Sequence, residues 1–343
     1  MLGATGAVGS TILKVLAERD FPVSELVPLA SGRSAGRQIP FGSSEVTVVE
    51  VSDESIQGLD IVLSSAGGSV SAEWAPKIVG AGAVVVDNTS YWRQHPDVPL
   101  VVAEVNPDAA DDHSGLVANP NCTTMQMMVA LAPIQREIGI ERLVVSTYQS
   151  VSGTGQKAID ELEAQSRAVL DGKTPQAHVY PHPIAFNVIP QVETFKDGDD
   201  YTTEERKVMA ETSKILGVSM DELRVSATCA RVPVVTGHSV SANVETAKDF
   251  SPEECRKLLA GAPGVVVMDS PADGVYPLAT DVAGRDDVLV GRIRRDPSHP
   301  RCLNMWIVGD NLRKGAATNA VQVAELLADR DLVRVPAGAS SLS

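Results

Sequence analysis

Cysteine and histidine are the side chains in this sequence best suited to nucleophilic and acid–base chemistry. Cys122 lies in the segment 119–123, Asn-Pro-Asn-Cys-Thr, directly before a stretch with helical spacing. Pro120 fixes the turn and Asn121 can cap the helix, which puts Cys122 in the first helical turn. The N–H groups and the dipole at a helix N-terminus stabilise a thiolate, so we predict that Cys122 is a nucleophile. The other cysteines lie in apolar patterns and are interpreted as core residues: Cys229, Cys255 and Cys302.

A thiolate nucleophile needs a partner that handles protons. His238 follows Thr236-Gly237 at the start of a predicted strand, where its side chain can project into a cleft. His182, between two prolines, is its rival. The residues alone leave the choice open, with His238 the favourite.

The N-terminus is rich in glycine. The segment 3–9 reads Gly-Ala-Thr-Gly-Ala-Val-Gly and opens a predicted helix at 8–19. Glycines at this spacing permit a tight turn and let backbone N–H groups approach a pyrophosphate, and the helix N-terminus adds positive charge. The placement of the motif before a helix in an alternating α/β pattern favours dinucleotide binding.

The loop after the second predicted strand indicates which dinucleotide binds. It contains Ser31, Arg33 and Ser34, and it lacks the acid that usually binds the ribose 2′-hydroxyl of NAD. Two hydroxyls and a guanidinium suit a 2′-phosphate. The sequence therefore favours NADP over NAD, with an ordinary surface arginine as the alternative.

The start of the chain departs from this pattern. A first strand of about five residues should precede the first glycine, yet only Met1 and Leu2 do so. Either the start codon is miscalled or the chain truncated, or the sheet has lost its middle strand. We favour a miscalled start and expect a chain extended upstream to be more stable, with a higher thermal midpoint.

Two composition regimes indicate two domains in these 343 residues. Residues 1–118 alternate short apolar strands with helical stretches, which predicts a Rossmann-like, doubly wound parallel sheet. The expected strands are 26–30, 46–51, 60–64, 83–87 and 100–103. Residues 119–311 place helices before longer strands, which predicts an α+β catalytic and dimerisation domain with a mainly antiparallel sheet. Its expected helices are 123–138, 155–170 and 203–216, and its expected strands are 224–230, 238–246, 288–293 and 302–308. A C-terminal helix at 312–330 is expected to complete the first domain.

Composition excludes several classes of protein. The formal charge of −15 repels phosphate backbones, so we expect no nucleic-acid partner. No stretch approaches the roughly 20 apolar residues that span a bilayer, and no signal peptide is evident. The four cysteines are not paired in CxxC motifs, which suits a reducing cytoplasm. We expect no metal site.

A series of ordered motifs makes the chain resemble the aspartate-semialdehyde dehydrogenases, most closely their bacterial, NADP-dependent branch. The motifs cover nearly the whole chain and are segments 3–9, 30–36, 87–93, 105–107, 119–123, 149–155, 180–187, 204–207, 231–234, 237–238 and 309–315. The departure from the family is the short first strand.

The resemblance implies NADPH-dependent reductive dephosphorylation of L-4-aspartyl phosphate to L-aspartate 4-semialdehyde, in lysine, threonine, methionine and diaminopimelate biosynthesis. Cys122 would attack the acyl carbon, expel phosphate and form a thioacyl enzyme. His238 matches the family's general acid/base. Gln149 matches the glutamine beside the cysteine, where it can orient the nucleophile or substrate.

The resemblance also assigns binding residues. Arg231 would bind the substrate carboxylate, and Glu204 its ammonium. Lys207, Arg93 and Asn121 would form the phosphate site. The cofactor would contact Gly3, Thr5, Gly6, Ala7, Val8, Ser31, Arg33, Ser34, Ala66, Gly67, Gly68, Gly155 and Asn311. The family also suggests a homodimer, built on the predicted sheet of the second domain.

Two alternatives remain at this stage. N-acetyl-γ-glutamyl-phosphate reductase has the same plan, but its acetylated substrate lacks the positive charge that Glu204 would match. A regulatory module that binds nucleotide without catalysis would have no reason to retain Cys122, Gln149, Arg231 and His238 together.

Overall fold

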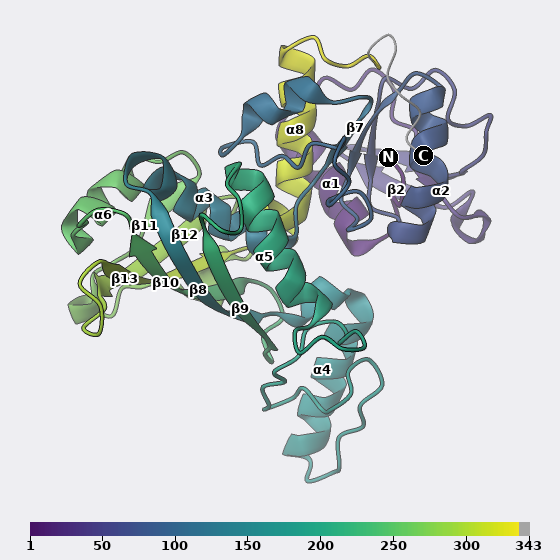
Figure 1. The fold of residues 1–343 in the computed structure, drawn as a ribbon. Coiled ribbons are helices and arrows are strands. Elements are labelled where there is room, and N and C mark those ends of the chain that lie inside the picture. Colours follow the sequence, from purple (N-terminus) through teal and green to yellow (C-terminus); the bar gives the residue numbers. More distant parts are fainter. Residues whose placement is uncertain (336–343) are drawn as a thin grey trace. The chain divides into compact units, whose positions relative to one another are not determined.

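The computed structural model describes residues 1–335, which form two compact units (Figure 1). The first comprises Met1–Asn121 together with the chain from Ala316 onward, and the second comprises Cys122–Gly315. No helix among the described residues is long and apolar enough to cross a membrane.

The first unit is built on a parallel sheet. Its strands, in spatial order, are β4 (Val49–Glu50), β1 (Leu29–Ala30), a bridge at Leu2, β5 (Ile61–Ser64), β6 (Val84–Asp87) and β7 (Leu116–Ala118). Helices α1 (Ala7–Glu18) and α8 (Thr318–Asp329) pack together on one face, and α2 (Gly68–Gly80) contacts β6 from the other (Figure 1). A β-hairpin (β2, Gln38–Phe41; β3, Ser44–Thr47) and two 3₁₀ turns (Gly32–Ser34; Pro107–Asp112) complete the unit. The expected doubly wound, Rossmann-type sheet is confirmed.

The residues Met1 and Leu2 occupy the position of the middle strand in this sheet. Leu2 forms parallel bridges with Leu29 on one side and Ser64 on the other. Its N–H donates to the carbonyl of Leu63 at 2.9 Å, and its own carbonyl accepts from Ser65 at 2.9 Å. The middle strand is therefore very short but paired on both sides.

Some expected strands are shorter than the sequence indicates. Segment 100–103 makes only an isolated bridge between Leu100 and Ala118. The bridge uses the Val101 N–H, which donates to the Ala118 carbonyl at 3.1 Å, and the Pro99 carbonyl, which accepts from the Ala118 N–H at 2.8 Å. The ladder stops there because Pro120 has no N–H and the Ala103 N–H donates to Asn319 Oδ1 at 3.0 Å. Similarly, the expected strand at 46–51 is divided between hairpin strand β3 and strand β4.

The second unit contains a six-stranded sheet with the order β11-β12-β13-β10-β8-β9. All six strands are labelled in Figure 1. The strands are β8 (Ile140–Gln149), β9 (Arg224–Arg231), β10 (His238–Thr246), β11 (Val265–Val267), β12 (Val288–Arg295) and β13 (Cys302–Gly309). The three central pairings are antiparallel, whereas the outer pairs β11–β12 and β8–β9 are parallel. The sheet is thus mixed, with the expected antiparallel centre.

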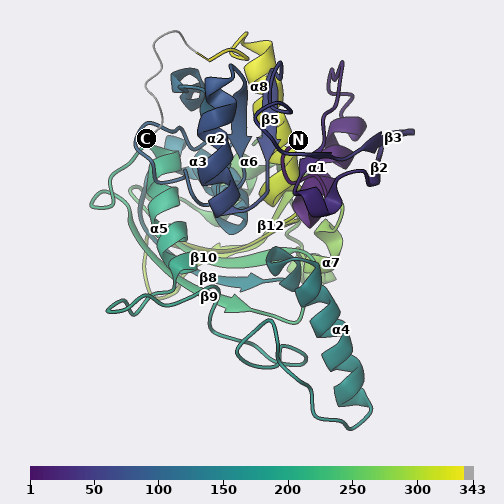
Figure 2. The same ribbon diagram turned by 90° about the vertical axis from the view of Figure 1, so that its right-hand side faces the viewer.

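Helices cover one face of this sheet. They are α3 (Cys122–Glu137), α5 (Thr203–Leu216) and α6 (Pro252–Ala260) (Figure 2). The strands alternate accordingly, with buried Leu143 and Val145 toward the helices and half-buried Val144 and Ser146 on the opposite face. Helix α4 (Gln156–Leu170) packs on a smaller apolar cluster that includes Ile184, and a short helix, α7 (Ala279–Val282), contacts β13.

Candidate functional site

Helix α3 begins at Cys122, as the sequence predicts. Cys122 is partly exposed, whereas the other three cysteines are buried. Burial raises the pKa of the Cys255 thiol to about 12 and also raises the pKa values of Cys229 and Cys302, so these thiols are poor nucleophiles. Gly315 lies against Cys122, because a Cβ at position 315 would lie 3.0 Å from the Cβ of that cysteine.

The first turns of α3 are attached to the start of strand β10. The side-chain amide of Gln126, four residues after Cys122, donates to the carbonyl of His238 at 3.1 Å. This bond connects the helix that begins with the predicted nucleophile to the residue predicted to handle protons. Gly309 permits the approach, since a Cβ there would lie 2.5 Å from Gln126 Oε1.

The His238 ring is fully buried and held through one nitrogen. Its Nδ1 lies 3.1 Å from the backbone N of Ser150 and 3.0 Å from the Ser150 hydroxyl. Its Nε2 has no hydrogen-bond partner. Burial and, secondarily, the Arg231 guanidinium hold the pKa of His238 well below its ordinary value, so the ring is neutral at neutral pH. The rival, His182, is an exposed loop residue.

Arg231, the last residue of β9, lies beside this histidine. Its NH1 donates to the Ser150 carbonyl at 2.7 Å, and its Nε is buried without a partner. Exposed Gly153 lies over both side chains. A Cβ at Gly153 would lie 3.3 Å from His238 Nε2 and 3.4 Å from Arg231 NH1. The Tyr180 ring lies 5.7 Å from the guanidinium, which favours the cation there.

Gln149 and Glu204 form a second polar pair. Gln149, the last residue of β8, donates to Glu204 Oε1 at 3.0 Å and to Thr147 Oγ1 at 3.3 Å. Glu204 is buried in the first turn of α5, and Lys207 Nζ lies 3.8 Å from its other oxygen. Lys207 also pairs with Glu193. A carboxylate held this way can receive an ammonium group.

Most of the predicted residues of the second unit thus fall into two hydrogen-bonded groups. One contains Gln149, Glu204 and Lys207, and the other contains Arg231, His238 and Asn311. Arg231 and His238 are both bonded to Ser150, and Asn311 joins them through the same serine. Gly155 caps helix α4 with a φ of 97°. Ser150, Ser152, Gly153 and Tyr180 were not singled out from the sequence, although the first three lie within the motif 149–155.

The glycine-rich loop of the first unit packs backbone against backbone. A Cβ on Gly3, whose φ is +83°, would lie 2.8 Å from the backbone N of Ala66. This contact brings the loop before α1 beside the loop that contains Ala66, Gly67 and Gly68. Gly6 and Ala7 are exposed at the start of α1, where helix N–H groups and small side chains give room for a pyrophosphate. The backbone N–H groups at the start of α1 therefore fit the pyrophosphate of a dinucleotide.

The loop predicted to bind a 2′-phosphate contains an acidic neighbour. Ser31 and Arg33 are exposed, and Ser34 is partly exposed. The Glu50 carboxylate at the end of β4 lies so close that a Cβ on Gly32 would be 2.6 Å from its Oε1. A cation at position 33 has to outweigh this charge for a phosphate to bind there.

Arg93 and Asn121, assigned to the phosphate site, both belong to the first unit. Arg93 is buried and donates from Nε to the Asn119 carbonyl at 2.9 Å and from NH2 to the Asn88 carbonyl at 2.8 Å. These bonds fix its guanidinium against the backbone just before Asn121.

One cluster of potential metal ligands was not evident from the sequence. Donor atoms of Glu245, His299 and Cys302 lie within 4.8 Å of one another. Arg301 NH2 lies 3.4 Å from Glu245 Oε1, and Arg224 NH2 lies 3.9 Å from Oε2. Because two guanidinium groups already balance this carboxylate, we assign no metal ion to the cluster.

Comparisons with known proteins agree with this arrangement. Residues 1–113 match the family described as "Semialdehyde dehydrogenase, NAD binding domain", and residues 131–314 match "Semialdehyde dehydrogenase, dimerisation domain". Aspartate-semialdehyde dehydrogenase of Aquifex aeolicus is 54% identical over 337 residues, which cover 97% of this chain and 98% of that protein.

Solved structures are similar over nearly the whole chain. The aspartate semialdehyde dehydrogenase II of Vibrio cholerae, complexed with ASA, is 46% identical with a TM-score of 0.91 and covers 96% of this chain and 97% of its own. The enzyme of Candida albicans, solved with NADP, is 26% identical with a TM-score of 0.75, covering 96% and 98%. The chain therefore belongs to the aspartate-semialdehyde dehydrogenase family of oxidoreductases.

Proposed function

We propose that this enzyme catalyses the NADPH-dependent reductive dephosphorylation of L-4-aspartyl phosphate to L-aspartate 4-semialdehyde through a thioacyl intermediate on Cys122. The product would enter lysine, threonine, methionine and diaminopimelate biosynthesis. The observation that carries the proposal is the bond from Gln126 to the His238 carbonyl, 3.1 Å long, which ties the nucleophile's helix to the histidine's strand.

The chemistry follows from the charge on each residue. Sulfur of Cys122 forms a bond to the acyl carbon, and the bond from that carbon to the phosphate oxygen breaks. NADPH, when bound, supplies a hydride. The carbonyl oxygen then carries negative charge, and His238 handles the proton at that oxygen. Collapse breaks the carbon–sulfur bond, which releases the aldehyde and restores the thiolate.

Binding of the substrate rests on charge matching. We assign the substrate carboxylate to Arg231, its ammonium to Glu204, and its phosphate to Lys207, Arg93 and Asn121. The burial of Glu204, with only 3% of its surface exposed, supports a charged amine over an acetylated one. An N-acetylated substrate carries no positive charge for that carboxylate to pair with.

The cofactor and the assembly are further parts of the proposal. Gly3, Thr5, Gly6, Ala7 and Val8, with the loop of Ala66–Gly68, would hold the pyrophosphate, while Ser31, Arg33 and Ser34 would take the 2′-phosphate. Gly155 and Asn311 would approach the nicotinamide. The enzyme would act as a cytoplasmic homodimer, and we place the 119–311 segment in the catalytic and dimerisation domain.

A reverse assay tests the reaction. The protein is mixed with L-aspartate 4-semialdehyde and NADP, with and without phosphate, and NADPH absorbance is followed. We expect formation that depends on phosphate, loss of it in Cys122→Ala, and retention in the control Cys302→Ala. NADP binding by Cys122→Ala, measured by titration, should persist. Activity without phosphate, or an active Cys122→Ala, would refute the acyl-phosphate mechanism. Replacing NADP with NAD tests the cofactor.

A further inference from the structure

Strand β4 brings a carboxylate to a loop whose own sequence lacks one. Glu50, the last residue of β4, pairs in parallel register with Ala30, the last residue of β1. The loop with Ser31, Arg33 and Ser34 begins directly after Ala30. In the sequence the β2–β3 hairpin separates Glu50 from this loop, so it is the pairing of β1 with β4 that brings the two together.

The Glu50 side chain packs against Gly32, within this loop. A Cβ at Gly32 would lie 2.6 Å from Oε1 and 3.2 Å from Oε2 of Glu50. Gly32 does not have a positive φ, so its backbone conformation would accept other residues. The glycine therefore matters here for the room that it leaves, and the carboxylate occupies that room.

The Glu50 carboxylate is not neutralised by a neighbouring cation. Among residues 1–335, the side chain that bonds to Glu50 is Ser55, and its hydroxyl donates to the main-chain carbonyl at 3.0 Å. The carboxylate itself makes no hydrogen bond or ion pair in this part of the chain, and neither does the Arg33 guanidinium. Both side chains are exposed, so a ligand at this loop meets one negative and one positive charge.

These two charges act in opposite directions on the nicotinamide dinucleotides. NADP carries a phosphate on the adenosine ribose where NAD has a 2′-hydroxyl. Arg33 attracts that phosphate, whereas Glu50 repels it. A carboxylate also accepts a hydrogen bond from the ribose 2′-hydroxyl, as the acid of NAD-binding Rossmann folds does. Both effects of Glu50 therefore favour NAD relative to NADP.

We propose that Glu50 is a specificity-determining residue that narrows the preference of this enzyme for NADP over NAD. Its carboxylate takes the place of the acid that NAD-binding Rossmann folds carry in the loop itself. The inference rests on the proposed function, because it needs the adenosine ribose at the loop of Ser31, Arg33 and Ser34.

Dissociation constants test this role without reference to catalysis. Isothermal titration calorimetry gives Kd for NADP and for NAD with the wild-type protein and with Glu50→Gln, which removes the charge and keeps the length of the side chain. We expect Glu50→Gln to bind NADP about threefold more tightly or better, because a like charge near the phosphate is gone. It should bind NAD no more tightly than wild type. A misfolded variant would lose affinity, so a gain is informative.

Two controls separate the local charge from other effects. Glu45→Gln removes the same charge from the exposed β2–β3 hairpin, where Glu45 pairs with Pro40 near the turn, and it should leave both Kd values unchanged. The gain of Glu50→Gln for NADP should shrink at about 1 M salt, where the Debye length falls to about 3 Å. A gain that salt does not reduce would assign the effect to shape and would overturn the inference.

Arg33→Gln distinguishes failure of this inference from failure of the proposed cofactor site. If Arg33→Gln weakens NADP binding while Glu50→Gln changes nothing, the 2′-phosphate site stands and Glu50 has no part in specificity. Equal gains for NADP and NAD in Glu50→Gln would also overturn the inference. If neither variant changes Kd for NADP, the 2′-phosphate does not bind at this loop, and the cofactor assignment fails together with the inference.

Discussion

At the scale of single residues, Gly153 lies beside two buried polar groups of the site, the His238 ring and the Arg231 guanidinium. It is exposed, yet a Cβ there would lie 3.3 Å from His238 Nε2 and 3.4 Å from Arg231 NH1. Its backbone does not have a positive φ, so alanine is conformationally allowed. The added methyl group would therefore occupy space that a bound substrate needs.

We predict that Gly153→Ala lowers kcat/KM for the semialdehyde by about tenfold or more, because a misplacement of about 1 Å can cost roughly 100-fold. Steady-state kinetics measure the effect, and a thermal midpoint within a few degrees of wild type shows that the fold is intact. Unchanged kcat/KM would mean that the substrate does not approach this side of the histidine.

The reactive side chains of the proposed site are easier to recognise in the sequence than the groups that hold them. Cys122, Arg231 and His238 have side chains whose chemistry is evident from type and motif. Ser150 acts through its backbone N–H on a ring 88 residues away, and an amide carries no residue-specific signal. The contact can be inferred once the pairing of β8 with β10 is known, because that pairing brings Ser150 close to His238.

At the scale of elements, helix α5 is fixed by a capping box that also reaches the sheet. Thr202 Oγ1 accepts from the Glu205 N–H at 3.3 Å, and the Thr202 N–H donates to Glu205 Oε2 at 2.8 Å. Glu205 Oε1 in addition accepts from the Cys229 N–H on β9 at 2.9 Å. The buried carboxylate of Glu205 thus caps the N-terminus of α5 and also attaches the helix to β9, the strand that carries Arg231.

We predict that Glu205→Ala lowers the free energy of unfolding by about 2–4 kcal/mol, since it removes a cap and leaves a buried N–H unsatisfied. The matched control is Glu254→Ala at the exposed capping box of α6, which should cost only about 1 kcal/mol. Denaturant unfolding measures both. Equal losses would show that the bond to Cys229 contributes nothing to stability.

The expected helices at 8–19, 123–138, 155–170 and 203–216 agree with α1, α3, α4 and α5 to within one residue at each end, whereas helix α6 and strand β8 were not predicted. Segment 100–103 was expected as a strand, but its pairing stops where Pro120 lacks an N–H and the Ala103 N–H donates to the Asn319 side chain. A side chain that competes for backbone hydrogen bonds gives no periodic signal.

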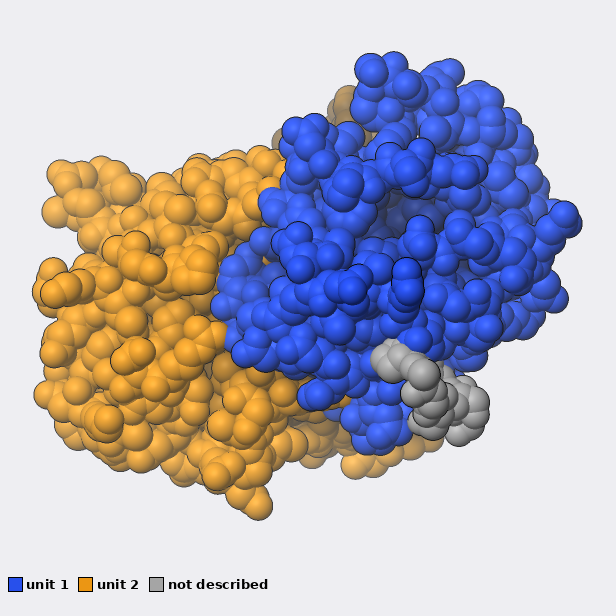
Figure 3. All heavy atoms as spheres, turned by 90° about the horizontal axis from the view of Figure 1, so that it is seen from above, with its two compact units in different colours: residues 1–121, 316–343 blue, residues 122–315 orange. Residues whose placement is uncertain are grey.

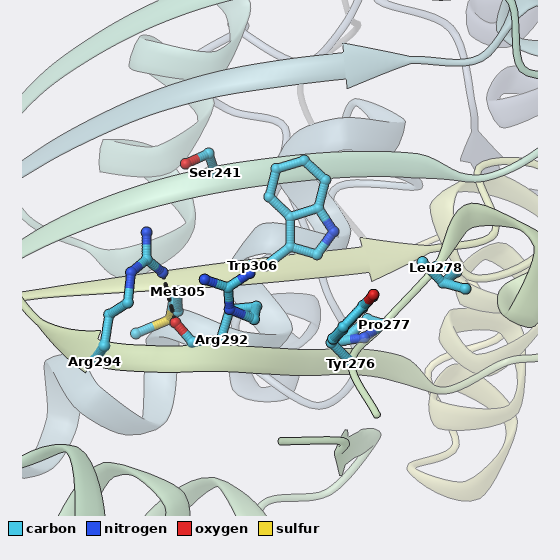
Figure 4. A pocket seen from close by; sticks show the side chains of 8 residues that line it. All are labelled: Ser241, Tyr276, Pro277, Leu278, Arg292, Arg294, Met305 and Trp306. Atoms are coloured by element: carbon cyan, nitrogen blue, oxygen red, sulfur yellow. Dashed lines mark hydrogen bonds between the residues drawn. The ribbon is translucent and has the colours of Figure 1, made fainter. Parts of the chain in front are cut away.

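At the scale of the whole molecule, the candidate surface for assembly is the face of the six-stranded sheet opposite to helices α3, α5 and α6. We call it the uncovered face. Trp306 and Tyr148 stack on it with ring centroids 5.3 Å apart. A pocket beside them is lined by Ser241, Tyr276, Pro277, Leu278, Arg292, Arg294, Met305 and Trp306 (Figure 4). Leu278 and Tyr276 are 47% and 37% exposed, which is unusual for apolar side chains grouped in this way.

The occupant we infer for this face is a second copy of the chain. The face belongs to the second unit, which is coloured orange in Figure 3, and the matching family model for residues 131–314 describes a dimerisation domain. Aromatic residues and arginine, which line this pocket, are the residue types enriched at protein interfaces.

We predict that Trp306→Glu converts a dimer into a monomer, because it removes the aromatic side chain beside Tyr148 and places a carboxylate, which is costly to desolvate, in the interface. Light scattering coupled to size exclusion measures the mass. Leu170→Glu is the control: Leu170 is 78% exposed at the end of α4 and does not line the pocket, and its replacement should leave the dimer intact. A Trp306→Glu protein that keeps the dimer mass would place the interface elsewhere, and a wild-type monomer would refute the assembly itself.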